Sequence, residues 1–241
     1  MIRLNDTQKA KEFLLKYRQL PMLYDIEDGD EDYAVYADNA EEISCVVIEY
    51  EPKNYYGVFS LEPKLLDEAY NRFFAEKHVW LGAADSRVFE YYKKYGFVCE
   101  EMCHMYEFTG TRQPNMDCPY AVTEIMPKDY RIVKERHQYR GTLKEIRKCA
   151  KKFPTSAIYI DGEMASWCMV HENLAMGPMF TLPEMRGKNL GVYVTNDLVG
   201  KLLDRNIKPY FLIVIGNASS EKLSKKVGFT PNGVSVGWCH K

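Results

Sequence analysis

A glycine-containing basic segment near residue 186 has the residue types needed to bind a phosphate group. The stretch TLPEMRGKNLGVYVT, at 181–195, contains Arg186, Gly187, Lys188 and Gly191 just before an amphipathic run. A helix start exposes backbone N–H groups and the positive end of the helix dipole, and together these bind phosphate. Asn189 stands where a tight phosphate loop would have glycine, but asparagine readily adopts positive φ. An ordinary turn before an ordinary helix is the alternative.

Two better-known nucleotide motifs are missing from this segment. The chain has no GxxxxGK[ST] sequence, so the segment is not the P-loop of a nucleotide-hydrolysing enzyme. It also has no strand-GxGxxG-helix pattern with a distal acidic residue, which argues against a dinucleotide fold.

The elements around this loop have strong local patterns. A helix is predicted over Gly187–Asn206, because Leu190, Val194, Leu198 and Leu202 repeat every four residues. The apolar run Tyr210–Ile215 predicts a strand buried in a parallel pair. A short helix over Ser220–Val227 follows. Its start is capped by Asn217, Ser219 or Ser220, its outer face carries Lys222, Lys225 and Lys226, and Gly228 ends it. The order is that of a right-handed βαβ unit with an added helix.

The rest of the chain alternates between strand-like and helical patterns. Strands are predicted at Ile2–Leu4, Tyr33–Ala37, Ile43–Tyr50, Tyr55–Leu61, His78–Ala83, Val98–Phe108, Tyr120–Ile125, Ser156–Ile160, Met164–His171 and Ala175–Thr181. Helices are predicted over Thr7–Arg18, Lys64–Glu76, Ser86–Tyr95, Asp129–His137 and Leu143–Lys152. This mixture predicts an α/β class fold with mixed sheets.

Two domains are predicted from a linker and an internal repeat. The polar stretch GTRQPNMDCP, at 110–119, contains two prolines. We therefore expect an N-terminal domain at 1–112, a linker at 113–119 and a C-terminal domain at 120–241. Asp85, Tyr92, Gly96 and Phe97 have the same mutual spacing as Asn217, Ser224, Gly228 and Phe229, which indicates a domain duplication.

Composition and charge limit the classes of partner. The chain has 241 residues, of which 46% are hydrophobic and 27% charged, and its net charge is −2. These values are typical of a soluble globular protein and predict no general affinity for nucleic acid or membrane. Charge is uneven, since residues 25–43 hold nine acidic side chains and 128–152 hold ten basic ones. These segments are solvated faces, or they face each other, or the basic one lines a site for an anion.

The seven cysteines are expected to be reduced thiols in a reducing compartment, because none sits in a CxxC pair. No metal site is expected, since Cys99, Cys103 and His104 lack a second ligand pair at zinc spacing. The N-terminal sequence has no apolar signal region and no run is long enough to span a membrane. We therefore expect a cytoplasmic protein.

Residues 155–233 resemble the cofactor-binding core of the GNAT acyltransferase superfamily. That family has Arg/Gln-x-x-Gly-x-Gly/Ala between its fourth strand and third helix, and here Arg186-Gly187-Lys188-Asn189-Leu190-Gly191 departs only at the first required glycine. The family's later Asn and Gly-Phe match Asn217 and Gly228-Phe229. Ser166-Trp167 and the run from Thr181 to Arg186 resemble the glycine N-acyltransferase-like branch, in which a degenerate copy of the fold precedes the catalytic one. The resemblance implies two tandem GNAT-like domains, each a mixed, mostly antiparallel sheet flanked by helices.

The resemblance implies a site for acetyl-CoA or another acyl-CoA as co-substrate. The pyrophosphate would bind Arg186 and the backbone N–H groups of Gly187, Lys188, Asn189, Leu190, Gly191 and Val192. The pantetheine arm would pair with the backbone of Met179, Phe180 and Thr181 as an added strand. Further contacts are expected from Asn217, Ser220, Lys222 and Lys225. Solvated helix charges are the alternative for the two lysines.

The catalytic residues are less well defined by the resemblance. The family's proton-donating Tyr in the fourth helix corresponds to Ser224, whose hydroxyl is a poorer acid that can still donate a hydrogen bond to the leaving sulfur. The glycine acyltransferase branch is expected to have a Glu where Ala175 stands. Glu172 and His171 are the nearest candidates for the base, and a water relay or no enzymatic base is the alternative.

The predicted function is acyl-CoA-dependent N-acyl transfer, most simply acetyl transfer, by direct attack of an amine in a ternary complex. A small-molecule amine is the expected acceptor, and the basic helices at 128–152 favour one with a carboxylate, such as an amino acid. The alternatives are a CoA-binding sensor or scaffold without catalysis, favoured by Ser224 and Ala175, and a protein-binding domain with no ligand. The sequence does not define the oligomeric state.

Overall fold

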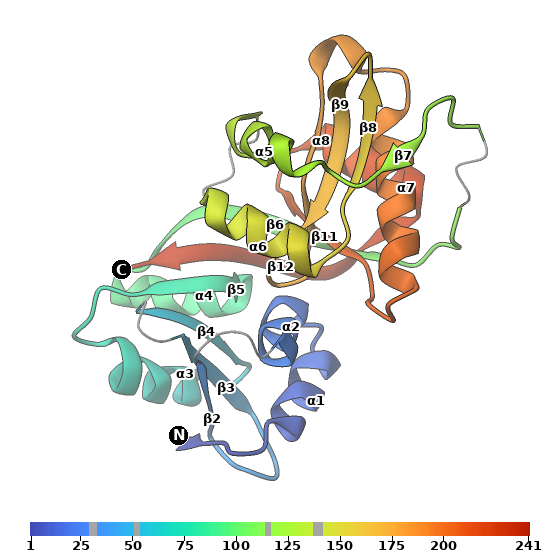
Figure 1. Cartoon of the computed structure of the whole chain (residues 1–241). Coiled ribbons are helices and arrows are strands. Elements are labelled where there is room, and N and C mark those ends of the chain that lie inside the picture. Colours follow the sequence, from blue (N-terminus) through green and yellow to red (C-terminus); the bar gives the residue numbers. More distant parts are fainter. Residues whose placement is uncertain (29–32, 51–53, 114–116, 137–141) are drawn as a thin grey trace. The chain divides into compact units, whose positions relative to one another are not determined.

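The chain divides into two compact units (Figure 1). The computed structural model describes residues 1–28, 33–50, 54–113, 117–136 and 142–241. Unit 1 comprises Met1–Met105 and Asn232–Lys241, and unit 2 comprises Tyr106–Pro231. The division therefore differs from the expected one in two ways. It falls before the predicted linker at 113–119, part of which lies outside the described residues, and the C-terminal segment belongs with the N-terminal half.

Unit 1 is a mixed sheet flanked by helices. Its strands are β1 (Ile2–Arg3), β2 (Tyr33–Ala37), β3 (Cys45–Tyr50), β4 (Tyr55–Ser60) and β5 (Trp80–Asp85), in that order, followed by parts of β12 (Phe229–His240) and β6 (Val98–Phe108). Its helices are α1 (Gln8–Lys16), α2 (Leu20–Asp28), α3 (Pro63–Ala69) and α4 (Ser86–Tyr92). A π-helical turn, Tyr70–Phe74, continues α3, and a 3₁₀ turn, Lys93–Tyr95, continues α4. The β4–β5 pair is parallel, and β1 to β4 pair antiparallel.

Helix α2 was not predicted from the sequence. Its apolar residues Leu20, Met22, Leu23 and Ile26 are all buried. The helix was missed because Pro21 is more typical of a turn. Proline is nevertheless tolerated in the first turn of a helix, where the N–H that it lacks would have no partner within the helix. The acidic residues that follow it lie partly outside the described residues.

Unit 2 contains the predicted βαβ arrangement. Its strands are β7 (Val122–Thr123), β8 (Ser156–Ile160), β9 (Glu163–Val170), β10 (Met176–Thr181) and β11 (Tyr210–Val214), and the end of β6 lies beside β11. Its helices are α5 (Tyr130–Arg136), α6 (Leu143–Lys152), α7 (Leu190–Leu203) and α8 (Ala218–Val227), with 3₁₀ turns at Pro127–Asp129 and Pro183–Met185. The predicted strand Tyr120–Ile125 is shorter than expected. His137, the predicted end of α5, lies outside the described residues.

The strands β10 and β11 separate soon after they meet. Their parallel ladder has a single registered pair among the described residues, Met176 with Phe211. On its other side β10 pairs with β9 through Met179, Phe180 and Thr181, after an irregularity that follows Met176. The C-terminal part of β10 therefore has one edge paired with β9 and one edge open.

The last strand, β12, was also missed by the sequence prediction. It starts in unit 2 and continues into unit 1 from Asn232, where Val236 pairs with Asp85 and His240 with Trp80. Strand β6 crosses in the opposite direction, at Met105. Pro231, with two glycines further along, gave the segment the composition of a loop.

All seven cysteines lie within the described residues and none of them forms a disulfide, and five of them are buried. Burial raises the pKa of the Cys45 and Cys103 thiols to about 12 and also raises that of Cys168. A buried thiol with a raised pKa is a poor nucleophile, so Cys168 acts as a small core residue. No helix in the described ranges is long and apolar enough to cross a lipid bilayer.

Candidate functional site

The loop before α7 adopts a left-handed conformation at two residues. Gly187 has φ of 81°, and Asn189, the residue that caps α7, has φ of 60°. Because these two residues are not helical, α7 starts at Leu190 rather than at the predicted Gly187. Asparagine tolerates this conformation better than most residues with a side chain, so it can stand where a glycine was expected.

The loop presents a run of backbone N–H groups that are available to a ligand. Among the described residues, none accepts a hydrogen bond from the backbone N–H groups of residues 187 to 191. The Val192 N–H donates to the Asn189 carbonyl at 3.0 Å. Val192 was predicted as a further donor to the anion, and this turn bond already occupies its N–H. The available donors therefore end at Gly191.

Basic side chains surround these donors. Arg186 donates from Nε to the Thr181 carbonyl at 3.2 Å, and its Cζ lies 5.7 Å from the centre of the Phe180 ring. Lys188 is exposed, and its Nζ lies 3.4 Å from Met185 Sδ. The loop thus combines free N–H groups with positive charge, the two features that bind an anion.

Lys226 lies next to the loop, a position that was not predicted from the sequence. Its Nζ donates to Asn189 Oδ1 at 2.8 Å, which joins α8 to the loop. The sequence placed Lys226 on the outer face of its helix, and only the approach of the two segments shows its partner.

Gly191 allows α7 to pack closely against two neighbours. A methyl group added there would lie 2.8 Å from Leu223 Cδ1 of α8 and 3.4 Å from Thr181 Oγ1 of β10. The residue is buried, so its small size brings the helix start next to the end of β10.

The open edge of β10 presents main-chain groups beside the loop. The Phe180 carbonyl faces β9, where it accepts from Ser166 Oγ at 3.2 Å. Hydrogen-bonding direction alternates along a strand, so the main-chain groups of Met179 and Thr181 face the open side. Arg186 already binds the Thr181 carbonyl. This edge can pair with an extended ligand chain.

Helix α8 begins with the predicted cap. Asn217 Oδ1 accepts from the Ser220 N–H at 3.1 Å, and Gly228 ends the helix with φ of 102°. Lys222 and Lys225 are exposed on this helix.

The structure gives Ser224 a local partner within its own helix. Its side chain is fully buried, and its Oγ donates to the Glu221 carbonyl at 2.9 Å. This geometry does not favour Ser224 as a hydrogen-bond donor to a leaving group.

The two candidate bases lie at the far end of β10 from the loop. Glu172 belongs to the turn that precedes β10, and its Oε1 lies 3.4 Å from Lys148 Nζ. His171 donates its backbone N–H to the Ala175 carbonyl at 2.8 Å. The five steps from Thr181 back to Met176 span about 17 Å of strand. A ligand that contacts both the loop and Glu172 must therefore lie along β10.

Helix α6 carries a basic stripe next to this turn. Lys144, Arg147, Lys148 and Lys151 line a cavity of about 360 Å³. A capping box fixes the helix start, in which Thr142 and Glu145 exchange hydrogen bonds. The stripe is formed by part of the basic segment noted in the sequence.

Comparisons with known proteins concern the family model that matches the chain and the fold. A family model described as FR47-like protein matches residues 159–236, which include the loop, β10 and α8. A search of curated proteins found no match.

Three solved structures cover nearly the whole chain at low identity. A Drosophila protein from a structural genomics consortium is 14% identical, covers 99% of this chain and 97% of its own, and has a TM-score of 0.74. A GCN5-related N-acetyltransferase from Kribbella flavida is 9% identical, with 95% of each chain covered and a TM-score of 0.61. A tandem GNAT protein from the clavulanic acid biosynthesis pathway is 12% identical, with 99% and 97% covered and a TM-score of 0.57. The chain has a GNAT-type fold.

Helix α3 of unit 1 starts with residues that differ from those at the start of α7. There, α3 begins after Glu62 with Pro63, which has no N–H to donate. The Glu62 carbonyl accepts the N–H groups of Leu65 and Leu66. Tyr92, which the predicted repeat matches to Ser224, is buried and donates from its hydroxyl to the Leu66 carbonyl at 3.0 Å. This helix start has no glycine loop and carries a nearby acid.

Proposed function

We propose that the protein is an acyl-CoA-dependent N-acyltransferase whose co-substrate binds in unit 2. One observation carries the proposal, namely five consecutive free N–H groups at the start of α7 next to the open edge of β10. A pyrophosphate group needs such donors and nearby positive charge, which Arg186, Lys188 and Lys226 supply.

The residues present fit the two parts of acyl-CoA. The pyrophosphate would accept from the N–H groups of residues 187 to 191, while the pantetheine amides would pair with the main chain of Met179 and Thr181. Asn217, Ser220, Lys222 and Lys225 lie on α8 or at its start, and the exposed lysines would contact the ribose phosphate. Acetyl-CoA is the simplest co-substrate of this kind.

The chemistry would be direct transfer within a ternary complex. The amine nitrogen attacks the thioester carbon, the carbon–sulfur bond breaks, and the amine loses a proton to a base. A backbone N–H at the open edge of β10 would polarise the thioester carbonyl. His171 and Glu172 remain candidates for the base, together with a water relay. The leaving thiolate takes up a proton.

The acceptor is proposed to be an amine that carries a carboxylate, such as an amino acid. The basic stripe of α6 supports this choice, because Lys144, Arg147 and Lys151 are exposed beside the cavity that they line. Lys148 lies against Glu172, which brings the stripe to the turn before β10. A carboxylate group would be attracted to this surface.

Calorimetric titration with CoA tests the binding site. Arg186→Ala and Lys188→Glu should each weaken binding about tenfold, since each removes a charged partner of the phosphates. Arg205→Ala and Lys128→Glu are matched controls on exposed surface of unit 2 and should leave the affinity unchanged. Gly191→Glu should abolish binding, but its buried position requires a parallel check of folding. Equal affinity in Lys188→Glu and the parent protein would contradict the phosphate loop.

Thiol release from acetyl-CoA tests the transfer step and the acceptor class. Amino acids should react faster than the corresponding amino acid amides, which lack the carboxylate. Lys144→Gln should raise the KM for the amino acid with little change in kcat, because it weakens binding of a remote group. Lys128→Gln is the control. Equal reaction of acids and amides would contradict an anionic acceptor.

A second candidate function is a CoA-binding sensor or scaffold without catalysis. The burial of Ser224 and the presence of Ala175 in place of a carboxylate favour it. The two candidates are separated by one result. CoA binding without thiol release, across a broad panel of amines, would support the sensor.

We also propose that unit 1 is a degenerate copy of unit 2, as in the glycine N-acyltransferase-like branch. Asp85 and Asn217 each cap the following helix with a side-chain oxygen, which accepts from the Arg87 N–H in α4 and from the Ser220 N–H in α8. Gly96 and Gly228 follow those helices with φ of 84° and 102°. The aromatic residue after each glycine is buried. Unit 1 lacks a glycine loop, so it is not expected to bind CoA.

A further inference from the structure

Unit 1 contains a cavity of its own that the proposed function does not use. Its volume is about 410 Å³, within the usual range for small-molecule sites. The end of α1, the start of α4 and the first residues of the C-terminal segment line it. All of these residues belong to unit 1.

The cavity has a positive lining. Its lining includes three cationic side chains, Lys16, Arg18 and Arg87, and a single carboxylate, that of Asp85. Among the described residues, Arg87 is the only one of the three cations with an ion-pair partner. Within the part of the chain that the structure describes, the lining therefore has an excess positive charge of about two with no carboxylate paired to it.

The one carboxylate serves to hold Arg87. Asp85 is 2% exposed, and its two oxygens accept from Arg87 Nε and Nη2, each at 2.8 Å. Asp85 Oδ2 also accepts from Gln19 Nε2 at 2.9 Å. The Arg87 guanidinium lies 5.4 Å from the centre of the Phe59 ring. Two hydrogen bonds and a ring contact thus fix the cation before any ligand arrives.

On the other side of the cavity, the two exposed cations Lys16 and Arg18 each contact a neighbouring group. Arg18 has φ of 57°, and its Nη1 donates to the Asn232 carbonyl at 3.2 Å. Asn232 Oδ1 in turn accepts from the Val234 N–H at 2.9 Å, across Gly233 with φ of 85°. The Lys16 ammonium lies 5.2 Å from the centre of the Tyr17 ring. Preorganised cations reduce the ordering cost of binding.

We propose that this cavity binds a small organic oxyanion with at least two negative charges, carried by carboxylate or phosphate groups. Such a ligand would neutralise the excess charge and accept charge-assisted hydrogen bonds from Lys16 and Arg18. The site is separate from the loop of unit 2 and does not depend on the proposed acyl transfer.

Calorimetric titration of the full chain at low ionic strength tests the proposal, with citrate as the carboxylate probe and pyrophosphate as the phosphate probe. Lys16→Gln and Arg18→Asn remove one cation each, and asparagine tolerates the positive φ at residue 18. Lys11→Gln, on the same helix but outside the cavity, is the matched control. Arg87→Gln is less suitable, because it would leave Asp85 buried with fewer partners.

We expect at least one probe to bind in the parent protein. Lys16→Gln and Arg18→Asn should weaken that binding by about ten- to a hundredfold, and Lys11→Gln should not. Pyrophosphate is also expected to bind at the loop of unit 2, so Lys188→Glu is titrated in parallel. The pyrophosphate binding that Arg18→Asn loses must be retained in Lys188→Glu. The probe that binds more tightly shows whether the natural ligand carries carboxylate or phosphate. Absence of binding by both probes would overturn the proposal, as would equal affinity in Arg18→Asn and the parent.

Discussion

Replacing Asn189 with valine is expected to weaken CoA binding by disturbing the backbone that presents the N–H groups. Asn189 has φ of 60° and ψ of 13°, in the left-handed region. A β-branched residue is rarely found there, because its Cβ approaches the neighbouring carbonyl oxygen. Asn189→Val also removes the acceptor for Lys226.

The size of the effect follows from this geometry. The left-handed conformation costs a β-branched residue up to about 1–2 kcal/mol more than asparagine, whose short polar side chain can form local hydrogen bonds there. If the loop of the variant relaxes to avoid that cost, CoA binding must restore the strained form, and the affinity falls by about five- to thirtyfold. If the loop remains in place, the same free energy is lost from the stability of the fold.

Two control variants make the test specific. Asn189→Gly should bind CoA with nearly the parent affinity, because glycine adopts this conformation without strain. Asn206 follows the other end of α7 and has φ of 58°, so Asn206→Val introduces the same strain far along the helix. It should lower the unfolding temperature and leave CoA binding unchanged. The reasoning is refuted if Asn189→Val matches the parent in both calorimetric affinity and unfolding temperature.

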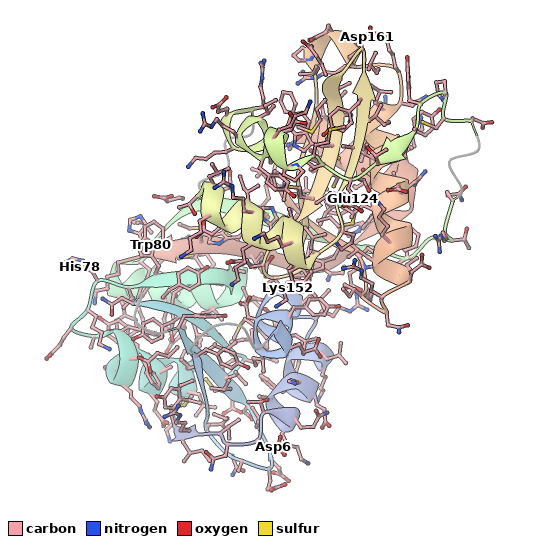
Figure 2. The ribbon with its side chains drawn as sticks, in the orientation of Figure 1. Asp6, His78, Trp80, Glu124, Lys152 and Asp161 are labelled. Carbon is pink, nitrogen blue, oxygen red and sulfur yellow. The ribbon has the colours of Figure 1, made fainter. Side chains whose placement is uncertain are left out.

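Three further predictions concern stability and turnover. Glu124, labelled beside α7 in Figure 2, accepts from the Thr155 N–H at 2.8 Å and lies 2.9 Å from Lys201. Burial raises its pKa, but the hydrogen bonds from Thr155 and Lys201 outweigh burial and lower the pKa overall. The carboxylate therefore stabilises the fold above its unfolded pKa, and this stabilisation is lost as pH falls through the lowered folded pKa. Because the side chain is 57% exposed, Glu124→Gln should cost only about 1 kcal/mol in urea unfolding at pH 7, with the difference disappearing in acid. Ser224→Ala should cost about 1 kcal/mol of stability and leave turnover unchanged; a lower kcat with unchanged CoA affinity would restore the serine to the mechanism. Calorimetry should give a single CoA per chain, and a second site would contradict the assignment of unit 1.

Local patterns in the sequence predicted the elements that hold the loop. Leucine and valine repeat every four residues along α7, and the apolar run of β11 follows it. Asn217 and Gly228 cap α8 as expected, since these residues satisfy helix ends through their own side chain or backbone. Each of these signals lies within the element that it predicts or directly at its end.

The elements that were missed depend on distant partners. Val236 of β12 pairs with Asp85, roughly 150 residues earlier in the chain, so no local pattern encodes the pairing. Helix α2 is stabilised by the burial of its apolar residues, which outweighs the turn-like appearance of Pro21. Strands β6 and β12 each run from one unit into the other, and no local pattern encodes this course either.

The candidate site was proposed from residue types, whereas its hydrogen bonds could not be predicted from the sequence. Arg186, Gly187 and Gly191 indicated an anion loop from the sequence alone. That Val192 is already bonded, and that Lys226 reaches Asn189, follow from torsion angles and from packing between segments. Ser224 had the spacing of a catalytic residue, whereas its hydroxyl bonds within its own helix.

The route of the chain through its two units has a consequence during synthesis. Unit 1 is completed by Asn232–Lys241, which pairs with β5 and lines the cationic cavity. A ribosome must first translate all of unit 2, which takes roughly ten seconds at typical rates. Throughout that delay the edge of β5 lacks its strand, and unpaired edges attract other chains. The β5 edge of the nascent N-terminal half is therefore open to pairing with other chains until residues 232–241 have been translated.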